Sequence, residues 1–370
     1  MLKINAGNEK IKIKYFGYLK DVEGYSTETR RAVKNSLYRY EEYTDFEDYS
    51  KLSKKKALGF KAHLEAKKHP HTGKPISLKT RYDYLRHVRE FFKWLSGQSG
   101  FKSKISINDV AYLKLSKEEN RMALSQGCVR YPTMDEIKQV ISSINISNEI
   151  DLRDRAVFAF TLLSGARDMA IITLPLQCFD ENTLIVDQDP VKGVKTKFKK
   201  HIISTLFKFD DELLGYVLDW VRYLKVDKQF KDTDPLFPRN RVENNKDIKK
   251  FVSTSIEPYF WESASSIRDM FKRRFENAGV EYYSPHTFRH LAVKMSTEKC
   301  RDGQELKAVS QNFGHENVGT TMTAYAKLPN DKVSNIITGM DFSPKKTGSQ
   351  ADILNKIQEL IKQEGQSGKF

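Results

Sequence analysis

The sequence has little cysteine and no long apolar run. Its three cysteines, Cys128, Cys178 and Cys300, are far apart and odd in number. This excludes a disulfide framework and a paired-cysteine zinc site, and it indicates a reducing compartment. No apolar run approaches the roughly 18 residues that span a bilayer, and the N-terminus carries no secretory apolar region. We therefore expect a cytoplasmic protein with no membrane partner.

Acidic residues are outnumbered by basic ones. The 370 residues include 63 Lys or Arg and 48 Asp or Glu, a net charge of +15. The length predicts two domains, and a hydrophobic content of 39% excludes global disorder. Residues 51–104 alone hold 15 Lys or Arg and 3 Asp or Glu, a net charge of +12. A well-solvated helical surface is the alternative, but this concentration favours a domain that lies along nucleic-acid phosphates.

An apolar stripe at helical spacing defines the clearest element of the basic region. The stripe consists of Tyr84, Leu85, Val88, Phe91, Phe92 and Leu95. We interpret these side chains as core, with Thr80 as the N-cap and Gly97 as the stop. Four basic side chains lie mostly off the stripe and are the predicted DNA contacts of this domain: Arg81, Arg86, Arg89 and Lys93.

The second half begins with a helix-start signal. Thr133 with Glu136 three residues later is a capping-box pattern. Residues 154–163 read as a buried helix, and residues 184–187 and 201–207 read as two strands around a lysine-rich turn. The rest, to about residue 340, is expected to be mainly helical. The predicted fold class is mainly α with a small antiparallel β-sheet (α+β).

The predicted organisation has five parts. Residues 1–25 form an arm or extension, which could be an edge strand or an arm; both an arm-binding module and an ordered part of the first domain remain open. Residues 26–115 form a helical DNA-binding domain, 116–131 a linker and 132–340 the second domain. Residues 341–370 form a tail with a short amphipathic helix at 353–361. Because one such helix is not stable alone, it should dock on its own domain or on a neighbouring protomer.

Four features of the second domain carry reactive residue types. Arg167 ends the segment Ser164-Gly165-Ala166-Arg167, after the buried helix. The turn 192–200 is rich in lysine. The segment 285–290 reads Pro-His-Thr-Phe-Arg-His, and its His286 and Arg289 share one helix face. His315 follows Gly314, and Tyr325 lies ten residues further on.

In this order the four features resemble the motifs of the tyrosine recombinase (phage integrase) family, over roughly residues 25–340. The resemblance implies a helical core-binding domain and a catalytic domain that form a C-shaped DNA clamp. It implies a site-specific DNA recombinase that cleaves and rejoins strands through a 3′-phosphotyrosine intermediate, to integrate or excise a mobile element. The implied partners are double-stranded DNA with inverted core sites, a second copy on one site and a homotetramer in the synapse.

The resemblance also implies roles for the side chains, and these suit phosphoryl transfer. Arg167 and Arg289 would bind the non-bridging phosphate oxygens through bidentate hydrogen bonds, and His315 would donate another. Tyr325 would be the nucleophile and His286 its general base. Because the phosphotyrosine bond conserves the energy of the phosphodiester, no metal, ATP or other cofactor is expected.

A lysine of the turn would protonate the 5′-hydroxyl leaving group. We favour Lys197, which precedes the return strand, over Lys195, and then over Lys192 or Lys200. Lys192, Lys195 and Lys200 are assigned to DNA contact. His290 is interpreted as a packing or supporting residue of the catalytic helix.

Two features depart from the family pattern. Ala170 stands where many members have an acidic residue; Asp168 could compensate, but it points elsewhere on a helix. The spacing from His315 to Tyr325 is one residue longer than the commonest form.

Each reactive residue also has an ordinary structural alternative, such as a surface ion pair for Arg167 or a core position for Tyr325. A non-catalytic DNA-binding relative and a DNA-relaxing topoisomerase remain the alternative functions.

Overall fold

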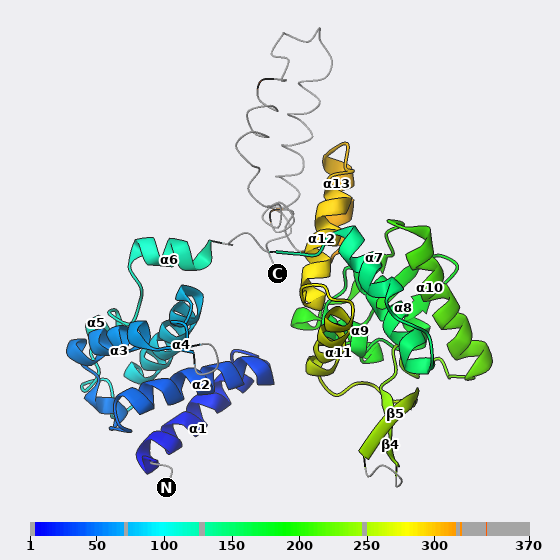
Figure 1. Cartoon of the computed structure of the whole chain (residues 1–370). Helices are drawn as coiled ribbons and strands as arrows, with labels where there is room; N and C mark the ends of the chain where they lie inside the picture. Colours follow the sequence, from blue (N-terminus) through cyan, green and yellow to red (C-terminus); the bar gives the residue numbers. More distant parts are fainter. Residues whose placement is uncertain are drawn as a thin grey trace. The chain divides into compact units, whose positions relative to one another are not determined.

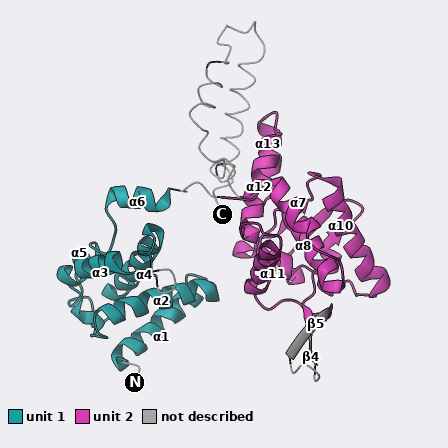
Figure 2. Ribbon diagram, in the orientation of Figure 1, with its two compact units in different colours: residues 1–127 teal, residues 128–370 magenta. Residues whose placement is uncertain are grey.

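The computed structural model describes residues 4–69, 73–125, 130–245 and 250–315, together with residues 319 and 338. The chain divides into two compact units, residues 1–127 and 128–370 (Figure 2). The division falls inside the segment 116–131 that was assigned to a linker. Both units are mainly helical, and the sheets are small and antiparallel, so the predicted fold class is confirmed.

Unit 1 is built from helices (Figure 1). They are α1 (Ala6–Asp21), α2 (Thr27–Tyr43), a 3₁₀ turn (Tyr49–Lys51), α3 (Lys54–Ala66), α4 (Leu78–Ser96), α5 (Ile107–Val110) and α6 (Lys117–Leu124). Helix α6 begins within the segment assigned to a linker. It starts at a capping box of Ser116 and Glu119, and its Ala123 joins the unit 1 core.

Helix α4 supplies the centre of the unit 1 core, as its apolar stripe predicted. Val88, Phe91 and Phe92 are fully buried. Gly97 ends the helix, but the N-cap is Ser77, whose Oγ accepts from the backbone N–H of Thr80. The prediction of Thr80 was therefore wrong by one turn, because an earlier hydroxyl satisfies the free N–H groups of the first turn.

Residues 6–21 form a helix, and the reading of this segment as an edge strand was wrong. Helix α1 is held by buried polar contacts to α2 and to the 3₁₀ turn that follows it. Lys12 Nζ lies 2.8 Å from Glu41 Oε2, and Asn8 Oδ1 accepts from the backbone N–H of Tyr49 at 3.2 Å. These contacts, with buried Tyr15, attach α1 to the unit 1 core.

Unit 2 contains helices and two small sheets. The helices are α7 (Met134–Ser142), α8 (Glu149–Ser164), α9 (Asp168–Ile172), α10 (Asp211–Arg222) with a π-helical turn (Tyr223–Asp227), α11 (Ala264–Asn277), α12 (Pro285–Thr297) and α13 (Gly303–Asn312). The strands are β1 (Phe179–Asp180), β2 (Ile185–Gln188), β3 (Ile202–Thr205), β4 (Asn240–Asn245) and β5 (Lys250–Ile256). Short 3₁₀ turns occupy Leu176–Cys178, Pro190–Lys192 and Lys197–Lys199.

Helix α8 is the buried axis of unit 2. Its Phe158 and Phe160 are fully buried, and it packs against α10 and α12. The predicted capping box at the start of α7 is present: Thr133 Oγ1 accepts from the Glu136 N–H at 3.1 Å, and the Glu136 carboxylate accepts from the Thr133 N–H at 2.7 Å. Since α8 ends at Ser164, its rigid C-terminus places the residues that follow.

The two predicted strands pair as β2 and β3, with Val186 opposite Ser204, and β1 adds a third strand. The β4–β5 hairpin, which extends away from the helices (Figure 1), was not predicted; it interrupts a segment that is otherwise mainly helical, as expected. Contacts from α8 hold its base. Arg153 Nη1 donates to the Pro238 carbonyl at 2.9 Å, and the Ile256 N–H donates to Glu149 Oε2 at 2.9 Å.

Candidate active site

Arg289 is fixed at the meeting point of three segments. It lies on the buried face of α12 and is 5% exposed. Its Nη1 donates to the Gly165 carbonyl at 2.7 Å, and its Nη2 donates to the Phe313 carbonyl at 2.6 Å. The same Nη2 lies 2.8 Å from His315 Nε2. Among the described residues, these contacts use three of the five N–H donors of the guanidinium, which leaves two for an anion.

Two glycines allow these segments to approach closely. Gly165 ends α8 with φ 56°, and a Cβ there would lie 2.3 Å from the Phe313 ring. Gly314 has φ 65°, and a Cβ there would lie 2.6 Å from the Ile202 side chain of β3. Both positions combine a left-handed backbone with no room for a side chain, which only glycine tolerates. The glycines therefore set the distance between Arg289 and the ends of α8 and α13.

Burial and a second guanidinium shape the electrostatics of the site. Burial, assisted by the charge of Arg167, lowers the pKa of Arg289 to about 9. Burial also lowers the pKa of Arg167. Both groups remain charged at pH 7, so the site holds two guanidiniums that repel each other and favour a bound anion.

Arg167 directly precedes α9, and its carbonyl accepts the N–H groups of Ala170 and Ile171 at 2.9 and 3.0 Å. Ala170 is buried, and Asp168 faces Arg268, whose Nε donates to Asp168 Oδ2 at 2.9 Å. Asp168 is therefore paired with Arg268, although its negative charge also favours the ionised form of Arg167. The backbone turn into α9 places Arg167 at the site.

Two histidines of α12 line the same region. His286 and His290 are one helical turn apart, with ring centroids 5.0 Å apart in an edge-to-face arrangement. Burial lowers the pKa of His286, and His290, Arg289 and Arg167 lower it further. Burial and Arg289 likewise lower the pKa of His290. At pH 7 His286 is therefore neutral and can accept a proton, as a general base requires.

His315 is neutral and has a defined tautomer. Burial lowers its pKa to about 4, assisted by the charges of Arg289, Arg167 and, more weakly, Lys200. A guanidinium can only donate, so the Nε2 that faces Arg289 accepts and the ring proton is on Nδ1. The structure thus brings together Arg167, His286, Arg289 and His315 from α12 and from the ends of α8 and α13.

Phe313 completes this cluster, although the sequence analysis gave it no role. Its ring lies 5.2 Å from the Arg289 guanidinium carbon and stacks 5.9 Å from the His315 ring. Its position two residues before a reactive histidine and directly before a glycine was the available signal. The ring excludes water from one side of the guanidinium.

The four lysines of the turn 192–200 that the sequence analysis singled out have different surroundings. Lys192 Nζ lies 2.7 Å from Asp187 Oδ2, and the Lys195 N–H donates to Thr173 Oγ1 at 2.9 Å. Lys197 Nζ lies 4.9 Å from the ring centre of Phe198, which is 81% exposed. The positive charge of Lys200 contributes to the lowered pKa of His315. The structure places all four on one loop between β2 and β3.

The predicted DNA contacts of unit 1 lie along α4 and are held by neighbouring side chains. Arg81 Nη1 lies 3.4 Å from Glu65 Oε1, and Lys93 Nζ lies 3.2 Å from Glu90 Oε1. Arg89 Nε donates to the same Glu90 oxygen at 3.1 Å.

Arg86 has a different partner, which the sequence analysis missed. Its Nη2 lies 3.0 Å from Nε2 of His87, a residue only 9% exposed. His87 follows Arg86 directly but points into the core, and nothing in the apolar stripe marked it as a partner.

Tyr325, the predicted nucleophile, lies outside the described residues, as does the predicted helix at 353–361.

In the described part of the chain, no helix combines the length and apolarity that crossing a membrane requires.

Comparison with known proteins places this site in a family. The sequence model of the phage integrase family matches residues 131–331. The tyrosine recombinase XerC of Lactobacillus leichmannii is 23% identical over 317 residues, 83% of this chain and 90% of that protein. The tyrosine recombinase XerD of Listeria monocytogenes is 22% identical over 304 residues, 80% of this chain and 87% of that protein.

Solved structures show the same fold. A lambda integrase dimer bound to a COC′ core site matches with a TM-score of 0.56 at 11% identity, over 92% of this chain and 80% of that one. The Tn1549 transposon integrase in complex with transposon right-end DNA matches with a TM-score of 0.55 at 14% identity, over 89% of this chain and 98% of that one.

Proposed function

This chain belongs to the phage integrase family, and from that premise we propose that it is a site-specific DNA recombinase that cleaves and rejoins DNA through a 3′-phosphotyrosine intermediate. The observation that carries the proposal is the cluster around Arg289. Within the described residues, three contacts fix its guanidinium and leave two N–H donors for an anion, and Arg167 adds a second positive charge. A phosphodiester is the anion that this arrangement suits.

The reaction then follows from the protonation states. Tyr325 Oη attacks the phosphorus, its proton passes to neutral His286, and the bond between phosphorus and the 5′-oxygen breaks. The 5′-oxygen takes a proton from a lysine of the turn 192–200, for which Lys197 remains the prediction. Arg167, Arg289 and the Nδ1–H of His315 bind the non-bridging oxygens, whose negative charge grows in the transition state. Rejoining reverses each step with a new 5′-hydroxyl.

A suicide substrate tests this chemistry. A duplex nicked near the cleavage point loses its 5′-fragment and traps the covalent adduct. We expect a protein–DNA adduct with the wild-type chain and none with Tyr325→Phe. Tyr259→Phe is the matched control, because Tyr259 is 57% exposed in unit 2 and the substitution also removes one hydroxyl.

Three results would contradict the proposal or a part of it. Salt-sensitive DNA binding without any adduct would indicate a non-catalytic DNA-binding protein. Relaxation of supercoiled plasmids that lack a cognate site would indicate a topoisomerase. An adduct that persists in Tyr325→Phe would exclude Tyr325 as the nucleophile.

The proposed assembly is a homodimer on inverted core sites and a homotetramer in the synapse, acting to integrate or excise a mobile element. The support is the relationship to the recombinases above, one of which is a transposon integrase. Sedimentation of the chain with one or two core sites would measure the stoichiometry, and two copies per site are expected. Attachment-like repeats beside the coding sequence would supply the substrate.

A further inference from the structure

We propose that Asp187 is a positioning residue that closes the base of the lysine loop, residues 192–200, and thereby sets where its ammonium groups meet the DNA. The inference rests on the proposed function. It concerns a side chain that does not itself contact the substrate.

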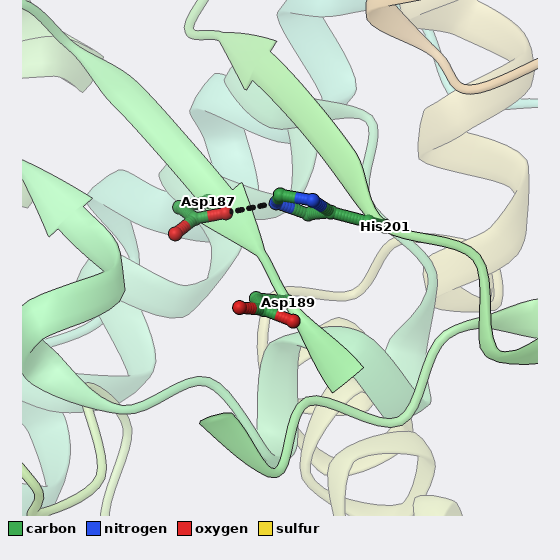
Figure 3. A group of neighbouring side chains, drawn as sticks. All are labelled: Asp187, Asp189 and His201. Carbon is green, nitrogen blue, oxygen red and sulfur yellow. Dashed lines mark hydrogen bonds and ion pairs between the residues drawn. The ribbon is translucent and has the colours of Figure 1, made fainter. Parts of the chain in front are cut away.

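Asp187 binds both ends of the lysine loop at once. It lies on β2, where its Oδ2 is 2.7 Å from Lys192 Nζ, at the loop's first residue. Its Oδ1 is 2.6 Å from Nε2 of His201, the residue that follows the loop and precedes β3 (Figure 3). An ionised carboxylate only accepts hydrogen bonds, so Nε2 of His201 carries the proton that it donates. One side chain therefore joins the exit from β2 to the entry into β3.

The charges support this closure. Partial burial of Asp187 opposes ionisation, but the hydrogen bonds from Lys192 and His201 outweigh it and lower the pKa of the carboxyl. The same contact raises the pKa of Lys192. Asp187 is thus a carboxylate at pH 7, although it lies beside a loop that must approach DNA phosphates. A negative charge at this position weakens the attraction of the loop for DNA. We therefore assign to Asp187 the function of holding the loop in place.

Asp189 provides the contrast. It lies two residues further along and could form a cation site with Asp187 and His201, since one ligand atom from each lies within 4.8 Å of the others. However, Asp189 Oδ1 accepts from the Val191 N–H at 2.8 Å, and the Lys192 ammonium is already on Asp187. A metal ion would have to displace Lys192, so the geometry favours an ion pair. Asp189→Asn is the matched control, because it removes the same charge and keeps the oxygen that caps the turn.

The consequence for catalysis is specific to the leaving group. If the loop delivers the proton donor, loosening its base slows protonation of the 5′-oxygen and leaves attack by Tyr325 intact. A substrate with sulfur in place of the scissile 5′-oxygen needs no such proton, because a thiol is a far stronger acid than an alcohol. The cleavage defect should therefore depend on which atom leaves.

The experiment measures single-turnover cleavage by the full chain on the oxygen and the sulfur substrates. For Asp187→Ala and Asp187→Asn we expect cleavage of the oxygen substrate to slow about tenfold, a fraction of what a general acid contributes. Cleavage of the sulfur substrate should stay within about twofold of the wild-type rate. DNA affinity should be unchanged or higher, and Asp189→Asn should match the wild type on both substrates.

Three outcomes would overturn the inference. Equal slowing on both substrates would show that Asp187 only maintains the fold, and no slowing would show that the loop does not depend on it. A comparable oxygen-specific defect in Asp189→Asn would show that local charge or a cation is responsible. Failure of the wild-type chain to cleave either substrate would instead overturn the proposed function, so the two failures are distinguishable.

Discussion

Arg289 is the central residue of the site because its neighbours hold the guanidinium in place before any phosphate binds. The Gly165 and Phe313 carbonyls accept from it, and the Phe313 ring covers one side. A long side chain that is already ordered loses little entropy when it binds an anion, so its hydrogen bonds act at full strength in the transition state. The ordering of the Arg289 side chain depends on the neighbouring residues more than on the arginine itself.

Gly165 is the neighbour most sensitive to change. In Gly165→Ala the new Cβ would meet the Phe313 ring at 2.3 Å in a left-handed backbone, so we expect a loss of about 2 to 3 kcal/mol in the free energy of unfolding. The measurement is chemical denaturation of the full chain. Gly215→Ala, inside α10 with nothing within 4 Å of its Cβ position, should instead stabilise by about 0.5 to 1 kcal/mol. Equal effects of the two substitutions would contradict this account of Gly165.

Helix α4 has two faces of different character. Its inward face builds the unit 1 core, while its basic side chains are partly exposed and held near acidic or histidine partners. An arginine held in place by a neighbour presents its remaining donors in a defined direction. The helix is therefore suited to follow a DNA backbone while its core face fixes it to unit 1.

The salt dependence of DNA binding tests this role of α4. Replacing Arg86 and Arg89 together by alanine should weaken binding and reduce the slope of log K against log salt by about two, because each lost phosphate contact accounts for about 0.9. Lys20→Ala is the control within unit 1, since Lys20 lies on α1 with a side chain 66% exposed. An unchanged slope in the double variant would show that α4 does not contact phosphates.

Across the whole chain, each unit encloses a histidine that folding keeps neutral. In unit 1, burial and the charge of Arg86 lower the pKa of His87 to about 4. Ser36 Oγ donates to the Ala32 carbonyl and accepts from His87 Nδ1 at 2.8 Å, which leaves Nε2 to accept from Arg86. In unit 2, burial lowers the pKa of His315 to about 4 as well. Protonation of either ring would break its bond from an arginine.

Stability should therefore fall with acid over a defined window. Between pH 6.5 and pH 4 the unfolded chain binds protons that the folded chain does not, so the free energy of unfolding decreases as the pH falls, by up to about 3 kcal/mol for each histidine. His87→Gln removes one of the two groups. The gap in stability between this variant and the wild type should narrow from pH 7 to pH 4, as measured by urea denaturation. A constant gap would exclude His87 as an acid-sensitive group.

What the sequence determined by itself is the set of features that short-range chemistry specifies. A capping box needs only residues three apart, and an apolar stripe needs only the helical repeat, so α7, α4, the buried α8 and the β2–β3 pair were predictable. The order of the reactive residues along the sequence also indicated the family without any structural information. Residues 6–21 and the β4–β5 hairpin were missed because contacts with distant partners, such as Glu41 and Arg153, stabilise them.

Only the tertiary structure decided how the site is held. The sequence placed Arg289 and His315 in one motif set, but it did not tell which imidazole nitrogen accepts, or that Phe313 covers the guanidinium. It gave no sign that Asp187 joins the two ends of the lysine loop. The physical reason is that hydrogen bonds and burial act through space, between segments as far apart as Gly165 and Arg289, whereas periodicity and caps act along the chain.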